Sequence, residues 1–346
     1  MIVVAYYDGT KLLNMKDING EKPEIFICTS NRSAGKTVFF NKLVFQRFLD
    51  KGEKFVLIYR YLIDMSDIAE QFFGEIGRLF YPQYNVQSKP VSNGIYHTIL
   101  CDSEVCGYAV ALNCADKIKR HSHRLADATS MLFDEFQTES GMYAANEVAK
   151  FKSLHVSIAR GGGEQAKYLP VYMLSNPVSI INPYYVELGI ADRLQSDTKF
   201  LRGNGWVMEQ GYNKSAAKAQ QESAFNKAFN NTEYMAYSTQ GKYLLDNQTF
   251  VQKVKGKNTY IATILYKGVE FGIRRYPEEG IIYCSKSVDK TAPLKIAITT
   301  ADHNINYVML GQNKMFVDAM RYYFDYGCFR FSDIQAREAI IKLLSY

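Results

Sequence analysis

One short segment constrains the fold of this chain more than any other. An apolar, strand-like run from Glu24 to Thr29 is followed by a polar loop, and apolar residues from Phe40 to Phe48 then recur at helical spacing. The loop is Ser30-Asn31-Arg32-Ser33-Ala34-Gly35-Lys36-Thr37. A strand, a loop and a helix in direct succession are typical of a phosphate-binding loop at the edge of a parallel sheet.

The loop meets most of the chemical requirements for binding a nucleotide triphosphate. Such a loop needs inward-facing N–H groups, a lysine for the β- and γ-phosphates and a hydroxyl on magnesium. Gly35, Lys36 and Thr37 supply the last parts of this pattern, but Ser30 stands where the first glycine is usual. A Gly-Lys-Thr tripeptide by itself also occurs as a surface turn, so the interpretation needs a second motif.

That second motif lies about a hundred residues later. Another apolar run, from Ser130 to Asp134, ends in two adjacent carboxylates, Asp134 and Glu135. In P-loop ATPases the first acid helps to hold Mg²⁺, and the second polarises the attacking water. The pair therefore predicts hydrolysis of ATP rather than transfer of its phosphoryl group to another substrate, as in a kinase. The alternative is that the two acids are simply a solvated strand end.

Three further residues are candidates for the same site. Asn176 ends a run from Val171 to Ser175 and could sense the γ-phosphate, although Asn176-Pro177 would also make an ordinary turn. Arg32 could swing toward the γ-phosphate or toward Glu135. Arg160, which precedes three glycines, could reach the nucleotide of a neighbouring subunit. For both arginines the alternative is a solvated surface side chain.

A basic run before the acidic pair could contact DNA. Its members are Lys117, Lys119, Arg120 and Arg124. If these residues line a pore, they could bind DNA phosphates without contacting the bases. Basic runs are also often only solvent-exposed surfaces. The net charge of +6 permits a polyanionic partner without requiring one.

The pattern along the chain predicts an α/β protein of two domains. Residues 1–200 alternate strand-like and helical runs, which indicates a mainly parallel sheet with helices on both faces. Residues 201–246 are expected to be an irregular stretch and a small helical linker. Residues 247–346 are expected to form an α+β domain, with a three-stranded meander and helices at 315–326 and 333–344. No signal peptide or apolar run long enough to cross a membrane is present, and the six cysteines show no CxxC pair, so we expect an intracellular protein without zinc.

Several motifs together resemble those of the genome-packaging (encapsidation) ATPases of phi-twenty-nine-like small podoviruses. The resemblance covers nearly the whole chain, and its most specific part is the run from Leu174 to Tyr185. The other matching segments are residues 30–37, 133–136, 146–148, 245–248 and 329–331.

The resemblance implies an ATPase core related to the FtsK/HerA translocases, which uses ATP and Mg²⁺. It implies a homopentameric ring that drives double-stranded DNA through the portal of a procapsid in the host cytoplasm, in some relatives with a structural RNA. Lys36 and Thr37 would bind the nucleotide, Thr37 and Asp134 would hold the metal, and Glu135 would be the catalytic base. Arg160 has the spacing after Asn146 that the family uses for its trans-acting arginine finger, and Arg32 occupies the arginine position of the family's phosphate loop.

For the C-terminal domain the resemblance implies a ribonuclease-H-like fold without nuclease activity. Two-metal cleavage needs clustered carboxylates, and the run Thr259 to Tyr266 contains none. The remaining candidates are too scattered along the sequence to replace them: Glu270, Asp289, Asp302 and Asp325. We therefore expect this domain to bind but not to cut.

Two other functions remain open at this stage. One is a cellular DNA translocase or helicase of the same superfamily, which would act on naked DNA without a procapsid. The other is a nucleotide-gated scaffold that does not hydrolyse ATP, which the substitution at Ser30 would favour if it disables the loop.

Overall fold

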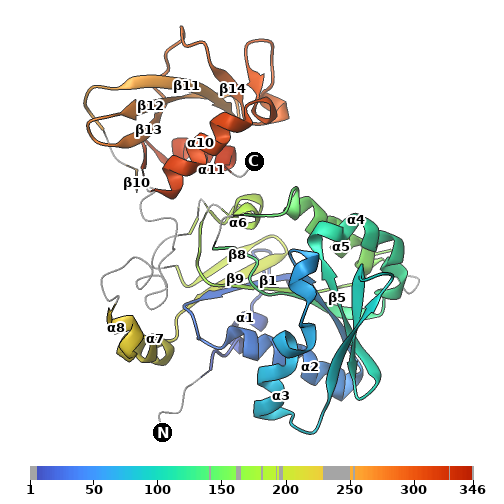
Figure 1. Ribbon diagram of the computed structural model, residues 1–346. Coiled ribbons are helices and arrows are strands. Elements are labelled where there is room, and N and C mark those ends of the chain that lie inside the picture. Colours follow the sequence, from blue (N-terminus) through green and yellow to red (C-terminus); the bar gives the residue numbers. More distant parts are fainter. Residues whose placement is uncertain are drawn as a thin grey trace. The chain divides into compact units, whose positions relative to one another are not determined.

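A computed structural model describes residues 6–139, 142–160, 165–180, 182–191, 193–194, 198–228, 250–251, 254–326 and 328–344. The chain forms two compact units (Figure 1). The first comprises Met1–Pro177 and Ser196–Lys242, and the second comprises Val178–Gln195 and Tyr243–Tyr346. Within the described part, no helix combines the length and apolar character needed to span a bilayer.

The first unit is built on a nine-stranded sheet. In spatial order its described strands are β3 (Val86–Val91), β4 (Tyr96–Cys101), β5 (Glu104–Ala111), β2 (Lys54–Tyr59), β6 (Ala128–Phe133), β7 (Val171–Ser175), β1 (Ile25–Ser30), β9 (Trp206–Gly211) and β8 (Phe200–Gly203). The strands from β5 to β9 pair in parallel, and β3, β4 and β8 are antiparallel at the two sides. The carboxyl ends of the parallel strands therefore meet at one edge, which is where ligands bind in such sheets.

Helices cover both faces of this sheet (Figure 1). On one face α2 (Lys36–Lys51) packs in a core cluster that includes Leu132 of β6, and on the other Phe133 stacks on Phe151 of α5 (Glu147–Ala159). Successive strand residues point to opposite faces, so neighbours in β6 serve different helices. The other α-helices in the described part of this unit are α1 (Thr10–Leu13), α3 (Glu75–Phe80), α4 (Ala115–Ile118), α7 (Lys214–Glu222) and α8 (Ala224–Ala228).

The segment after residue 200 differs from our expectation. We predicted an irregular stretch leading into a helical linker, but β8 and β9 belong to the first sheet, and β9 pairs in parallel with β1. The two strands are short and are joined by a turn at Gly205, where φ is 73°, and this interruption hid them in the sequence. Helical structure begins at Lys214, and the part of the predicted linker beyond residue 228 lies outside the described residues.

Only part of the apolar run from Phe55 to Tyr61 belongs to a strand, β2. It ends at Tyr59, so Arg60 lies just beyond β2 rather than within it. The antiparallel strands β3 and β4 were not predicted from the sequence. Because they lie at the side of the sheet, they extend it without changing the edge that carries the phosphate loop.

The second unit contains its own sheet and core. Its described strands, in spatial order, are β10 (Phe250–Val251), β16 (Phe329–Phe331), β13 (Ile281–Ser285), β12 (Val269–Tyr276), β11 (Thr259–Tyr266), β14 (Lys295–Ala297) and β15 (Val308–Met309). The predicted antiparallel meander is confirmed as β11, β12 and β13, while β14 and β15 continue the sheet in parallel from β11. The likeness of this unit to a ribonuclease-H-like fold stays a prediction.

The two predicted C-terminal helices are confirmed. They are α10 (Lys314–Asp325) and α11 (Ile334–Leu344), and apolar residues of both join the core of the second sheet. A short helix, α6 (Pro183–Glu187), also belongs to this unit. The motif at residues 245–248 lies outside the described residues.

Candidate functional site

The phosphate loop joins β1 to α2 and contains two residues in the left-handed region. These are Ser33, with φ of 59°, and Gly35, with φ of 93°. At Gly35 a side chain would be strained, and its Cβ would lie 2.6 Å from the ring of Tyr6. Ser30 instead ends strand β1 and does not have positive φ, so its position can carry a side chain. The backbone thus does not require a glycine at Ser30.

The loop is also held by a part of the chain that sequence reasoning assigned to a linker. Asn31 and Asn213 exchange hydrogen bonds: the Asn213 N–H donates to Asn31 Oδ1 at 2.9 Å, and Asn31 Nδ2 donates to the Asn213 carbonyl at 3.2 Å. Gln220 of α7 donates to Ser33 Oγ at 2.9 Å. Asn213 also caps α7 by accepting from the Ala216 N–H at 3.0 Å. An asparagine before a helical run was the only sequence signal for this contact.

The order of the strands brings the predicted nucleotide-site residues together. Strand β7 lies between β1 and β6, so Asn176, which directly follows β7, lies between the phosphate loop and the acidic pair. Lys36 Nζ donates to Asn176 Oδ1 at 2.7 Å. The Thr37 hydroxyl donates to Asp134 Oδ2, also at 2.7 Å. Segments separated by about 140 residues in the sequence thereby form one polar site.

The charges in this site are only partly satisfied. Lys36 is 7% exposed, and burial lowers its pKa although Asp134 opposes the shift. Burial raises the pKa of Asp134 in spite of Lys36 and the Thr37 hydroxyl. Loss of hydration also raises the pKa of Glu135, and repulsion by Asp134 adds to this shift. A ligand that brings both negative phosphate oxygens and a cation would stabilise all three charged forms.

The residues present fit a magnesium–nucleotide complex. Mg²⁺ is usually bound through one or two carboxylates, several waters and substrate phosphates. Asp134 and Thr37 supply oxygen ligands of the right kind at 2.7 Å from each other. A cavity of about 570 Å³ opens on Thr37, Asp134 and Glu135, which leaves room for water beside the acids.

Arg32 lies close enough to Glu135 for its positive charge to lower the pKa of that carboxyl, and it also has an acidic partner within the chain. Its guanidinium forms an ion pair with Glu139. Since both side chains are more than a third exposed, the pair contributes little stability and can open. Arg32 therefore lies beside the site, while its contact with a nucleotide stays a prediction.

Arg160 lies at the opposite edge of the sheet from Lys36 of its own chain. Because β6 and β7 are parallel, α5 must run from the carboxyl edge back to the amino edge. Its 13 residues span roughly 20 Å, and Lys167, bonded to the Ala159 carbonyl, also contacts the carbonyl of Ala128 where β6 begins. Arg160 is exposed and makes no side-chain hydrogen bond or ion pair with another described residue. The three glycines after it lie outside the described residues.

The predicted basic run lies in the crossover between β5 and β6 and is not part of this site. Lys119 forms an ion pair with Asp116 at 2.9 Å, and Arg124 donates to the Tyr96 hydroxyl at 3.5 Å. Lys117 and Arg120 are exposed. The last two are thus the better candidates for contacting a polyanion.

Comparison with known proteins identifies the relatives of this chain. A model of the family described as "Podovirus DNA encapsidation protein (Gp16)" matches residues 2–345. The DNA packaging protein of Bacillus phage B103 is 24% identical over 285 residues, which cover 82% of this chain and 84% of that protein. The DNA packaging protein of Bacillus phage phi29 is 22% identical over 285 residues, which cover 82% and 81%.

Two solved structures share the fold over almost the whole chain. One belongs to the bacteriophage Phi-29 viral genome packaging motor assembly, with a TM-score of 0.58, 21% identity and coverage of 98% of this chain and 99% of that chain. The other belongs to the Phi-28 gp11 DNA packaging motor, with a TM-score of 0.65, 17% identity and coverage of 98% and 97%. Both likenesses agree with the two-unit fold.

Proposed function

The chain belongs to the podovirus DNA encapsidation protein (Gp16) family of viral DNA packaging ATPases, and we propose that it hydrolyses ATP at the site around Lys36 to drive double-stranded DNA into a procapsid. The observation that carries this proposal is the convergence of Lys36, Thr37, Asp134 and Asn176 at one edge of the sheet, with Glu135 directly after Asp134. These groups are the ones that ATP hydrolysis requires.

Each residue has a distinct part in the proposed reaction. Lys36 exchanges its bond to Asn176 for the β- and γ-phosphates, which frees the Asn176 amide to sense the γ-phosphate. Thr37 and Asp134 would hold Mg²⁺, which would neutralise charge on the phosphate oxygens. Glu135 orients the attacking water and accepts its proton, and its raised pKa makes the carboxylate a stronger base for this step.

Arg160 supports a ring in which each chain completes its neighbour's site. It cannot serve the phosphate loop of its own chain, because α5 carries it to the other edge of the sheet. A second copy that presents this arginine would supply the missing positive charge opposite Lys36. We propose a homo-oligomeric ring, with a pentamer as the expected size, at the portal of a procapsid in the host cytoplasm.

Sequence-blind contacts with DNA phosphates would complete the motor. Lys117 and Arg120 are exposed and are the proposed contacts, with Lys119 and Arg124 as weaker ones because each already has a partner within the chain. Neutralising one phosphate contact should reduce the salt dependence of binding by a slope of about 1.

The test compares three variants in ATP binding, phosphate release and DNA packaging with portal-bearing procapsids. Glu135→Gln should still bind ATP but lose hydrolysis by roughly 10²- to 10⁴-fold, and packaging with it. Lys36→Ala should lose binding, and Glu104→Gln, an exposed acid of the same unit, should behave like the unmodified chain. Packaging by Glu135→Gln would refute the role of this residue.

The same assays separate the other candidate functions. Translocation on naked DNA without procapsids would indicate a cellular type of translocase. Absence of phosphate release from the unmodified chain, alone and with procapsids and DNA, would leave a nucleotide-gated scaffold. Packaging measured with and without added structural RNA shows whether the motor requires one.

A further inference from the structure

The turn that carries Glu135 has a backbone conformation that needs support. Glu135 has φ of 54°, in the left-handed region that a residue with a side chain rarely adopts. Its N–H donates to Asp134 Oδ1 at 2.9 Å, and the N–H of Phe136 donates to the carbonyl of Leu174 in β7 at 3.1 Å. These bonds hold the two N–H groups of the turn and leave its carbonyl groups to be satisfied from another side.

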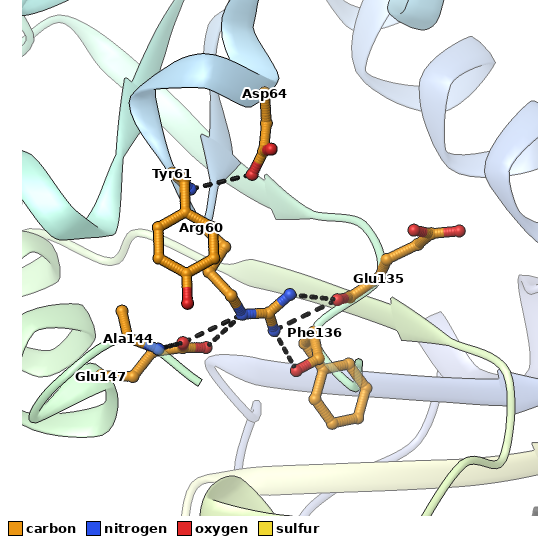
Figure 2. Close-up of polar contacts among 7 residues, drawn as sticks. All are labelled: Arg60, Tyr61, Asp64, Glu135, Phe136, Ala144 and Glu147. Carbon is orange, nitrogen blue, oxygen red and sulfur yellow. Dashed lines mark hydrogen bonds and ion pairs between the residues drawn. The ribbon is translucent and has the colours of Figure 1, made fainter. Parts of the chain in front are cut away.

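Arg60 satisfies those carbonyl groups (Figure 2). It follows β2, the strand beside β6, and both of its terminal nitrogens lie 3.3 Å from the Glu135 carbonyl oxygen. One of them also donates to the Phe136 carbonyl at 2.7 Å. Figure 2 shows the Glu135 carboxyl group directed away from this guanidinium. Arg60 thus fixes the backbone of the turn and leaves the carboxylate available to the site.

Glu147 holds Arg60 in this orientation. The Arg60 Nε lies 3.0 and 3.2 Å from the two carboxylate oxygens of Glu147, which also accepts the Ala144 N–H at 2.7 Å. The Glu147 side chain is 1% exposed and that of Arg60 is 11% exposed. Glu147 belongs to the Asn-Glu-Val motif at residues 146–148, for which the sequence suggested no role. A buried charge at this position is costly unless its partner is in place.

We propose that Glu147 and Arg60 are positioning residues for ATP hydrolysis: the pair locks the backbone of Glu135 so that its carboxylate faces the attacking water. The inference rests on the proposed function, since it assigns the support of the proposed catalytic base. Lysine cannot replace Arg60, because a single ammonium cannot reach two carbonyls and a carboxylate in one plane.

The experiment uses the full chain with procapsids and DNA. Arg60→Lys keeps the positive charge but loses the planar guanidinium that donates to several oxygens at once. The double variant Arg60→Met with Glu147→Gln removes both charges, so that neither is left buried without a partner. Arg47→Lys is the matched control, because Arg47 donates to the Tyr172 hydroxyl at 2.6 Å, near the other end of β7. We measure kcat per bound nucleotide, KM for ATP and the melting temperature.

We expect kcat to fall roughly 10- to 100-fold in Arg60→Lys and in the double variant, with KM within about twofold of the unmodified chain, because small displacements of a catalytic group cost rate rather than binding. Arg47→Lys should leave kcat unchanged. Expressing kcat per bound nucleotide excludes unfolded chains from the comparison.

Two results would overturn the inference in distinguishable ways. If the unmodified chain hydrolyses ATP and the double variant does so at the same kcat, the pair is structural only and the proposed function stands. If the unmodified chain does not hydrolyse ATP, the proposed function itself fails and the inference falls with it.

Discussion

The acidic residues of the two units differ in what satisfies their charge. In the first unit, Asp134 and Glu135 lie at a strand end, where burial raises the pKa of both, and repulsion by Asp134 raises the pKa of Glu135 further. In the second unit, hydrogen bonds from Thr291 lower the pKa of Asp289. For Asp134 and Glu135, burial outweighs the positive charge of Lys36, whereas hydrogen-bond donors outweigh burial at Asp289.

Asp302 shows how the second unit uses its acids. Its carboxylate accepts from the backbone N–H groups of Lys267 and Gly268 at 3.0 and 2.8 Å and from the Thr299 hydroxyl at 2.6 Å. Burial raises its pKa, but these donors outweigh burial and the pKa is lowered. Asp302 thus stabilises the β11–β12 turn rather than a ligand.

The difference suggests how to separate functional from structural carboxylates. A bound metal adds little stability to an ionised carboxylate that already accepts hydrogen bonds from the protein. It adds much more where burial disfavours the ionised form. Among the described residues, no group of three or more His, Cys, Asp or Glu side chains could hold a metal ion. A magnesium ion in the first unit would therefore depend on the phosphates of its nucleotide for most of its charged ligands.

The largest effect predicted by this comparison is on hydrolysis. Asp134→Asn should lower the rate of phosphate release by on the order of 10²-fold or more, since charge stabilisation by a bound metal is worth several kcal/mol. Asp302→Asn should leave the rate unchanged because its carboxylate serves only the turn. Steady-state phosphate release over a Mg²⁺ titration checks both. Equal losses in the two variants would contradict the distinction.

For the free energy of unfolding, we expect the larger effect from Asp302 in the second unit. Asp302→Ala leaves the N–H groups of Lys267 and Gly268 without their acceptor and should lower the free energy of unfolding by about 1–3 kcal/mol. Asp116→Ala, which removes an exposed ion pair with Lys119, should have a much smaller effect because solvent screens this pair. Urea unfolding of the full chain measures both. A neutral Asp302→Ala would show that the turn does not need this acid.

The comparison also shows which features were predictable from the sequence. Lys36, Thr37, Asp134 and Glu135 were found because each belongs to a short motif beside an apolar strand, where local pattern and chemistry agree. The two-domain α/β class followed from the same periodicity. In the second unit the meander and both helices were found for this reason as well.

Features that depend on long-range contacts were missed. Arg60 lies 87 residues from Glu147, and Asn31 lies 182 residues from Asn213. Nothing in a local pattern connects such positions until the order of the strands is known. The distance of Arg160 from its own phosphate loop likewise follows only from the parallel direction of β6 and β7.

The pH dependence of stability gives a smaller effect. Because the pKa of Glu135 is raised on folding, the folded chain binds more protons than the unfolded chain just above about pH 4, and stability falls as pH rises through the folded pKa. Glu135→Gln removes this loss, so without nucleotide it should raise the melting temperature more at pH 7 than at pH 4. Asp289 has the opposite sign: its contribution is present above about pH 4 and is lost on acidification. A Glu135→Gln gain that is equal at both pH values would contradict the raised pKa.

The smallest effect is expected for nuclease activity. Two-metal cleavage needs carboxylates that converge on both ions, and β11 carries none, while Glu270 of β12 accepts a hydrogen bond from the Tyr307 hydroxyl. We predict that the full chain leaves supercoiled plasmid intact with Mg²⁺ or Mn²⁺, and that Glu270→Gln changes nothing in gel assays. Cleavage that requires the metal and is abolished by Glu270→Gln, but not by Asp134→Asn, would place a working metal site in the second unit. The carboxylates of the two units would then differ in the reaction they serve rather than in whether they serve one.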